Sequence, residues 1–135
     1  MSYVYFNYGM HHLVNAVTDV EGCPAAVLIR ALAPFDGVAL MRRRRARRGG
    51  RSAQSMPDHE LCRGPGNLCV ALGIDLRQNQ RDLTSGALRI EDHGIVPAAL
   101  EWSRRVGIRV GVEREWRCSW RGHPAVSGPR GSARR

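Results

Sequence analysis

A run of aromatic residues near the N-terminus constrains the fold more than any other feature of the sequence. Segment 3–8 reads Tyr-Val-Tyr-Phe-Asn-Tyr, and it holds all three tyrosines and one of the two phenylalanines of the chain. Aromatic and β-branched residues favour strands, and strand alternation puts Tyr3 and Tyr5 on the same face. Because Gly9 can take the positive φ of a tight reversal, the run predicts a β-hairpin with Tyr8 beside the bend. An aromatic ring at a hairpin tip is poorly placed for burial and well placed to be pushed into a partner.

The residues that follow predict an antiparallel meander. Segment 13–17 is the expected return strand, and segment 25–32 is apolar on both faces except for Arg30, which is typical of a central strand. An unpaired guanidinium on that face would be costly. Two interpretations remain open. Arg30 either reaches solvent or pairs with a structural carboxylate, or it faces a cleft and holds a phosphate, a water or a catalytic carboxylate.

The charge of the chain points to a phosphate-rich partner. All 21 basic residues are arginine, and against 12 acidic residues they give a formal net charge of +9. Arginine suits bidentate phosphate contacts, although a GC-rich genome also favours arginine codons. Six arginines fall within 42–48, on a helix expected to begin at Val38 after a capping Asp36. That run is either a solvated helix face or a phosphate-contacting surface.

The cysteines and the N-terminal residues indicate a protein of the cytoplasm. None of the four cysteines forms a C-x-x-C pair, so we expect free thiols in a reducing compartment and no metal or other cofactor. The first residues do not form a signal peptide, and no apolar run approaches the length needed to span a membrane.

The rest of the chain predicts a second compact motif followed by short elements. A turn at 64–66 leads into a short helix expected to begin at Asn67 and to end at Gly73. Beyond it we expect the following elements in chain order: a strand at 87–91, a helix at 98–105, and strands at 106–112 and 116–120. A single domain is therefore expected over residues 1–127, with 128–135 as a disordered basic tail.

Four motifs in a fixed order resemble a known family. They are Tyr-Val-Tyr-x-x-Tyr-Gly-Met-x-x-x-x-Asn at 3–15, Val-Leu-Ile-Arg-Ala-Leu at 27–32, Leu-Cys-x-Gly-Pro-Gly-x-Leu-Cys-x-Ala-Leu-Gly-Ile at 61–74, and Trp-x-Gly-x-Pro-x-Val-Ser at 120–127. Together they make the chain similar to the alkyladenine, or 3-methyladenine, DNA glycosylase (Mpg) family. The resemblance implies a mixed α/β (α+β) domain of the FMT C-terminal domain-like kind. Such a domain has a curved antiparallel sheet with a protruding hairpin and surrounding helices.

The resemblance also assigns roles to individual residues. Tyr8 matches the residue that wedges into the minor groove and fills the gap left by the extruded nucleotide, with Met10 beside it at the DNA surface. Tyr5 matches a pocket wall against which the flipped base stacks. Asn15 matches the residue at the pocket floor that screens the edge of the base. Arg30 matches the arginine that helps hold the attacking water and the DNA backbone.

The implied activity is base excision repair by a monomeric, cofactor-free hydrolase on double-stranded DNA in the bacterial cytoplasm, associated with the nucleoid. It would cleave the N-glycosidic bond of alkylated or deaminated purines such as 3-methyladenine, 7-methylguanine and hypoxanthine. Chemistry at that bond requires the nucleotide to leave the stack, and an inserted aromatic ring replaces part of the stacking that is lost. A cationic alkylated base also gains on the order of 1 to 2 kcal/mol on a tyrosine face.

The sequence departs from the family at the general base. In the family this base is a glutamate in a segment that precedes the tyrosine motif, and none of the six glutamates of this chain falls at the matching place. We therefore expect either a late-assigned start or an N-terminally truncated domain, and the activity of the chain alone stays open. The alternatives are a noncatalytic DNA-binding fragment and a basic RNA-binding module.

Overall fold

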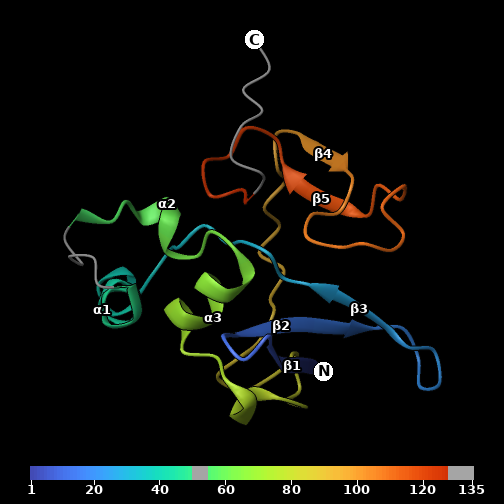
Figure 1. Cartoon of the computed structure of the whole chain (residues 1–135), viewed down its shortest axis with the longest axis horizontal. Helices are drawn as coiled ribbons and strands as arrows, with labels where there is room; N and C mark the ends of the chain where they lie inside the picture. Colours follow the sequence, from blue (N-terminus) through green and yellow to red (C-terminus); the bar gives the residue numbers. More distant parts are fainter. Residues whose placement is uncertain (50–54, 128–135) are drawn as a thin grey trace.

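The computed structural model describes residues 1–49 and 55–127 and shows two antiparallel sheets with short helices on one side (Figure 1). The first sheet has the strand order β1-β2-β3 and the second pairs β4 with β5. The strands are β1 (Ser2–Asn7), β2 (His11–Thr18), β3 (Ala25–Leu28), β4 (Leu100–Ser103) and β5 (Arg117–Trp120). The helices are α1 (Val38–Gly49), α2 (Asp58–Leu61), α3 (Pro65–Leu72) and the short 3-10 helix η2 (Leu76–Gln78). The expected α+β class is confirmed. The expected disordered tail at 128–135 lies outside the described residues.

The core lies between α3 and one face of the β1–β2 hairpin. Val4 and Val14 are directly opposite each other in the register of the two strands, and both are buried. Helix α3 supplies Leu68, Cys69 and Ala71, each at most 1% exposed. Gly73 ends this helix in the left-handed conformation, with φ of 73°, as the sequence predicted. Burial of this apolar face fixes which side of the hairpin remains available for other contacts.

The outer edge of β1 is covered by the chain that follows η2. The Ser2 hydroxyl, fully buried, donates to the carbonyl of Gln78 at 2.5 Å and accepts from the Arg81 amide at 2.9 Å. The Asn79 side chain accepts from the Val4 amide at 2.9 Å. These bonds satisfy polar groups that an open strand edge would leave unpaired, so β1 is held on both sides.

The strand predicted at 25–32 is shorter than expected, and it lies at an edge of the sheet. Strand β3 ends at Leu28, and no strand among the described residues pairs with its outer edge. Val27 in this strand is 55% exposed. The chain then turns away, and the Leu32 amide donates to the Cys62 carbonyl at 3.3 Å. Arg30 therefore lies beyond the strand, where the chain crosses from the sheet towards α2 and α3.

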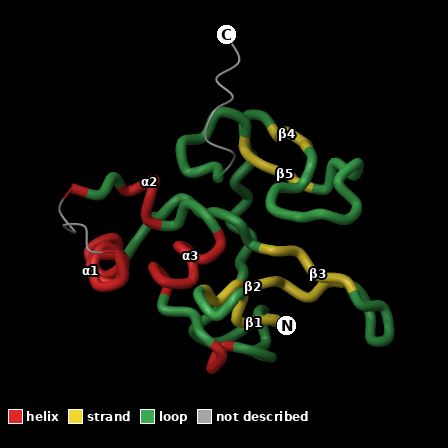
Figure 2. The backbone as a smooth tube through the Cα atoms, in the orientation of Figure 1, coloured by secondary structure: helices red, strands yellow, loops and turns green. Residues whose placement is uncertain are grey.

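The elements predicted between 87 and 112 are wrong, while the final strand is confirmed as β5. Segment 87–91 is a loop, and β4 lies inside the region where a helix was expected (Figure 2). The strand expected at 106–112 is also a loop, because Gly107 and Gly111 take positive φ values of 78° and 67° that turn the chain out of an extended path. None of the helices in the described part of the chain is long and apolar enough to cross a membrane.

The buried thiols of the core predict a loss of stability at alkaline pH. Burial raises the pKa of Cys69 from 9.0 to about 11. A group whose pKa is raised by folding stabilises the fold fully below its ordinary pKa, and that contribution disappears as the pH rises towards the folded-state value. We expect the free energy of unfolding to fall between pH 9 and pH 11, and to fall less steeply in Cys69→Ala. Urea titrations at several pH values test this, and equal slopes in parent and variant would contradict it.

Candidate nucleic-acid interface

The tip of the β1–β2 hairpin projects an aromatic side chain on a strained backbone. Tyr8 and Gly9 take φ values of 48° and 64°, and the Met10 amide closes the turn on the Asn7 carbonyl at 3.0 Å. A positive φ is unfavourable for a bulky non-glycine residue, at a cost of about 1 kcal/mol or more. The Tyr8 side chain is nevertheless 88% exposed. The predicted hairpin is confirmed, and its tip holds an aromatic ring that contributes little to folding.

The face of the hairpin opposite α3 brings Tyr5 and Asn15 together. Residues directly paired across two strands share a face, so the Tyr3–Asn15 pair and the Tyr5–Leu13 pair lie on one side of the sheet. The rings of Tyr3 and Tyr5 stack, with their centroids 5.4 Å apart and their planes at 28°. Asn15 is 8% exposed, and its Nδ2 donates to the Tyr3 carbonyl at 3.1 Å. This bond uses one hydrogen of the Asn15 amide and leaves the second hydrogen and Oδ1 for another partner.

Arg30 reaches the same face of the sheet. Burial raises the pKa of the Tyr5 hydroxyl above its ordinary value, Tyr3 adds to this, and the positive charge of Arg30 opposes it. The Ile29 amide donates to the Val14 carbonyl at 3.1 Å and the Ile29 side chain packs against the core, so alternation turns Arg30 to the opposite face, on which Tyr5 lies. Because the net shift of the Tyr5 pKa is upward, the phenol stays neutral at physiological pH and presents an uncharged ring.

The guanidinium of Arg30 is half-buried without an acidic partner. Its Nε is buried and has no hydrogen-bond partner among the described residues. Burial lowers the pKa of Arg30, and the like charge of Arg117 lowers it further. The sequence left open that Arg30 pairs with a structural carboxylate. No such pair is found in the described part of the chain. The position is one where an anion or another acceptor would be bound favourably.

A cleft of about 780 Å³ opens next to Arg30, between β3 and the β4–β5 hairpin. All three tryptophans of the chain line it, and each is at least 42% exposed: Trp102, Trp116 and Trp120. The sequence predictions did not identify this cleft. The available signal was the confinement of every tryptophan to residues 102–120, in an otherwise aromatic-poor chain.

Two more arginines form part of the cleft and were also missed. Arg105 lies over the Trp116 ring, with its Cζ 5.2 Å from the centroid. The Nη1 of Arg117 donates to Ser103 Oγ at 3.1 Å. None of the described residues that line the cleft is acidic. The cleft is therefore apolar on its walls and positively charged at Arg30, Arg105 and Arg117.

The predicted site residues thus fall into two neighbouring groups. Tyr5, Asn15 and Arg30 share the face of the sheet opposite α3, and Tyr8 and Met10 occupy the hairpin tip. Arg30 lines the cleft, whereas neither Tyr5 nor Asn15 does. Met10 is 58% exposed, and its carbonyl accepts a hydrogen bond from Arg48 Nη2 on α1. The described residues contain no group of three His, Cys, Asp or Glu side chains placed to hold a metal ion.

The environment of Arg30 predicts that this residue does not stabilise the fold. Arg30→Met keeps the length of the side chain and removes a half-buried charge that lies beside Arg117. We expect the free energy of unfolding to stay the same or to rise by about 1 kcal/mol. Arg30→Lys, which keeps the charge, should show no such gain. Denaturant titration of the three proteins tests this, and marked destabilisation by Arg30→Met would reveal a structural role.

Comparison with known sequences identifies the family. The sequence model described as Methylpurine-DNA glycosylase (MPG) matches residues 1–124. A relative from Rubrobacter xylanophilus is 45% identical over 118 residues, covering 87% of this chain and 57% of the relative. A relative from Burkholderia lata is 42% identical over 130 residues, covering 94% of this chain and 59% of the relative.

Both relatives carry the name "Putative 3-methyladenine DNA glycosylase". A protein from Chlamydia pneumoniae with the same name is 45% identical over 107 residues, 79% of this chain and 51% of that protein. The chain thus spans less than two thirds of the length of these curated relatives. Since the family match covers nearly all of its residues, the chain belongs to the methylpurine-DNA glycosylase family.

Proposed function

We propose that this chain supplies the base-flipping and base-binding part of a DNA glycosylase that removes damaged purines, such as 3-methyladenine, from duplex DNA. The observation that carries the proposal is the hairpin tip. Tyr8 is 88% exposed on a backbone with a φ of 48°, and the Tyr5 and Asn15 side chains lie on the adjoining strands. Strain held at an exposed aromatic residue is typical of a functional position.

In this proposal Tyr8 acts as the wedge. Extruding a nucleotide from a duplex costs a few kcal/mol of stacking and pairing, and the cost is lower at a damaged pair. A ring inserted into the gap replaces part of that stacking. Tyr8 is already directed outwards, so little reorganisation of the hairpin would be needed for insertion.

Tyr5 and Asn15 recognise the extruded base. Because the pKa of Tyr5 is raised, its ring stays neutral and presents an electron-rich face that favours a cationic alkylated base. Asn15 has one amide hydrogen directed to the Tyr3 carbonyl. Its remaining polar atoms select among base edges, because an unmatched donor or acceptor in a closed pocket is costly.

Arg30 binds the backbone and positions the attacking water. Its half-buried guanidinium has no acidic partner among the described residues, so a phosphate or a polarised water supplies the missing acceptor. Water activation also requires a general base. The cleft beside Arg30 has no carboxylate among its described lining residues, so the chain alone is expected to bind and flip the damaged base and to cleave its glycosidic bond slowly. The protein acts as a monomer on the DNA of the bacterial nucleoid.

A second candidate function is a noncatalytic module that uses the same wedge. The absence of a carboxylate among the described lining residues of the cleft favours it. One experiment separates the two functions. The chain is incubated with a duplex that carries one hypoxanthine, and abasic sites are then cleaved with alkali. Scission above the level of an unmodified duplex supports the glycosylase. Binding without scission supports the module, and binding to single-stranded RNA in preference to duplex DNA would contradict both.

The wedge role predicts a selective effect of substitution at the hairpin tip. Tyr8→Ala removes a ring whose stacking on a base is worth about 1 to 3 kcal/mol, so preference for the damaged over the undamaged duplex should fall by about 5- to 150-fold. Tyr8→Phe keeps the ring and should retain most of this preference. Fluorescence anisotropy with both duplexes measures the ratio. An unchanged ratio in Tyr8→Ala would show that the exposed ring is not the wedge.

A further inference from the structure

The arginine-rich helix α1 is the motif that the proposed function does not use. Its arginines are not simply solvated, because several hold the helix against its neighbours. Arg42 pairs with Asp58, and Arg45 Nη1 donates to Asn67 Oδ1. These contacts attach α1 to α2 and α3, and further along the helix Arg48 reaches the Met10 carbonyl at the hairpin tip.

A basic groove of about 420 Å³ lies between α1, the end of α3 and the start of β2. Its charged and titratable lining consists of Arg44, Arg47, Arg48, Arg77, His12 and Asp75. Four guanidinium groups therefore face one carboxylate. Such an excess is characteristic of a site for a polyanion.

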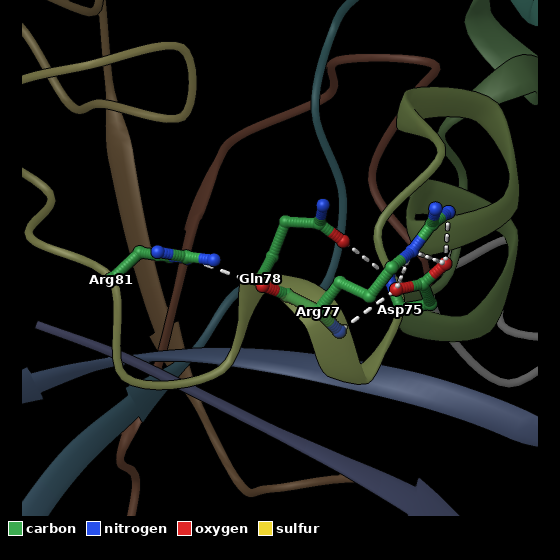
Figure 3. A network of polar contacts seen from close by, with 4 residues as sticks. All are labelled: Asp75, Arg77, Gln78 and Arg81. Carbon is green, nitrogen blue, oxygen red and sulfur yellow. Dashed lines mark hydrogen bonds and ion pairs between the residues drawn. The ribbon is translucent and has the colours of Figure 1, made fainter.

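The single carboxylate of the groove is already neutralised. Arg77 Nη2 lies 2.8 Å from Asp75 Oδ2, and its Nε lies 3.0 Å from Oδ1 (Figure 3). The Arg77 amide also donates to Asp75 Oδ1 at 2.8 Å. Hydrogen bonds from the Arg77 side chain lower the pKa of Asp75 to about 2, so the ion pair persists at neutral pH. The three arginines of α1 are left without a compensating charge from within the groove.

Two of these three arginines are held in place by backbone carbonyls. Arg44 Nη1 donates to Ala71 O at 3.1 Å and packs over Gly73, where an added Cβ would lie 2.9 Å from the guanidinium carbon. Arg48 donates to the carbonyl of Met10. Carbonyl contacts orient a guanidinium without cancelling its charge. Arg47 is exposed, with no hydrogen bond or ion pair to another described residue, and so is available to a ligand.

The groove and Arg30 lie on opposite sides of the hairpin. His12 points to the same face as Val4 and Val14, on which α3 packs, whereas Tyr5 and Arg30 are on the other face. The tip, with Tyr8, adjoins the groove, because Arg48 donates to the Met10 carbonyl. A minor groove is bordered by two phosphate backbones, so a wedge inserted into it has a backbone on each side.

We propose that the groove formed by Arg44, Arg47 and Arg48 with Arg77 binds phosphodiester groups of duplex DNA, along the backbone on the side of the wedge opposite Arg30. This inference rests on the proposed function for its orientation, because Tyr8 defines where the duplex lies. The contacts are with phosphates alone, so they add affinity for damaged and undamaged DNA equally. Helix formation does not require the arginine run, and these phosphate contacts give it a role.

The test compares two exposed arginines of the same helix. Arg47→Gln removes a charge from the groove, and Arg43→Gln removes an exposed charge that does not line it. Affinity of the full chain for 25-base-pair duplexes with and without one hypoxanthine is measured between 50 and 200 mM salt. We expect Arg47→Gln to weaken binding of both duplexes by the same factor and to reduce the slope of log affinity against log salt by about 1. Arg43→Gln should change the slope much less, and all proteins should melt at the same temperature.

The outcomes separate the groove from the proposed function. Equal slopes for the parent and Arg47→Gln, equal effects of the two substitutions, or no binding of duplex at 50 mM salt would each overturn the groove. If duplex is bound but the groove is overturned by the slopes or by equal effects of the two substitutions, loss of lesion preference in Tyr8→Ala would leave the proposed function intact. Conversely, a reduced slope in Arg47→Gln together with no lesion preference in the parent would support the phosphate site and contradict the glycosylase proposal.

Discussion

The packing of α3 on the Val4–Val14 pair is the interaction on which the rest of the structure depends. It decides which face of the hairpin α3 covers, and so leaves Tyr5 and Asn15 on the opposite face. The contact is close at the start of the helix, where a Cβ on Gly66 would lie 2.9 Å from the His11 ring. A side chain larger than hydrogen at that position would push α3 away from the base of the turn. The position of the exposed tip therefore depends on how α3 packs against the hairpin in the core.

Local signals in the sequence were sufficient for the hairpin and for α3. The alternation of residues 3–8, the positive φ available to Gly9 and the closing Gly73 each act within a few residues, and the structure has each feature. The region from 87 to 112 was predicted wrongly because an alternating apolar pattern, as at 106–112, does not form a strand by itself. Its conformation depends instead on glycines at positive φ and on pairing between β4 and β5, which are more than ten residues apart.

The neighbours of the site residues could not be predicted from the sequence, for a related reason. The sequence placed Arg30 on a strand, but its neighbours Tyr5 and Arg117 come from opposite ends of the chain. The arginine run could be read only as a charge pattern. In the structure Arg44 and Arg48 are bound to the backbone carbonyls of Ala71 and Met10. Guanidinium groups thus serve as cross-links that pair with carbonyls rather than acids, which keeps the net charge of the surface high.

The backbone at Tyr8 has a consequence for how this protein tolerates change. Asparagine and glycine adopt a positive φ with little penalty, so either residue at this position would relieve strain that the tyrosine maintains. A substitution of this kind would raise the thermal stability of the hairpin, and it would also remove the exposed ring of Tyr8. Selection for stability alone would remove the exposed ring while leaving the sheet, the core and the charge of the protein unchanged.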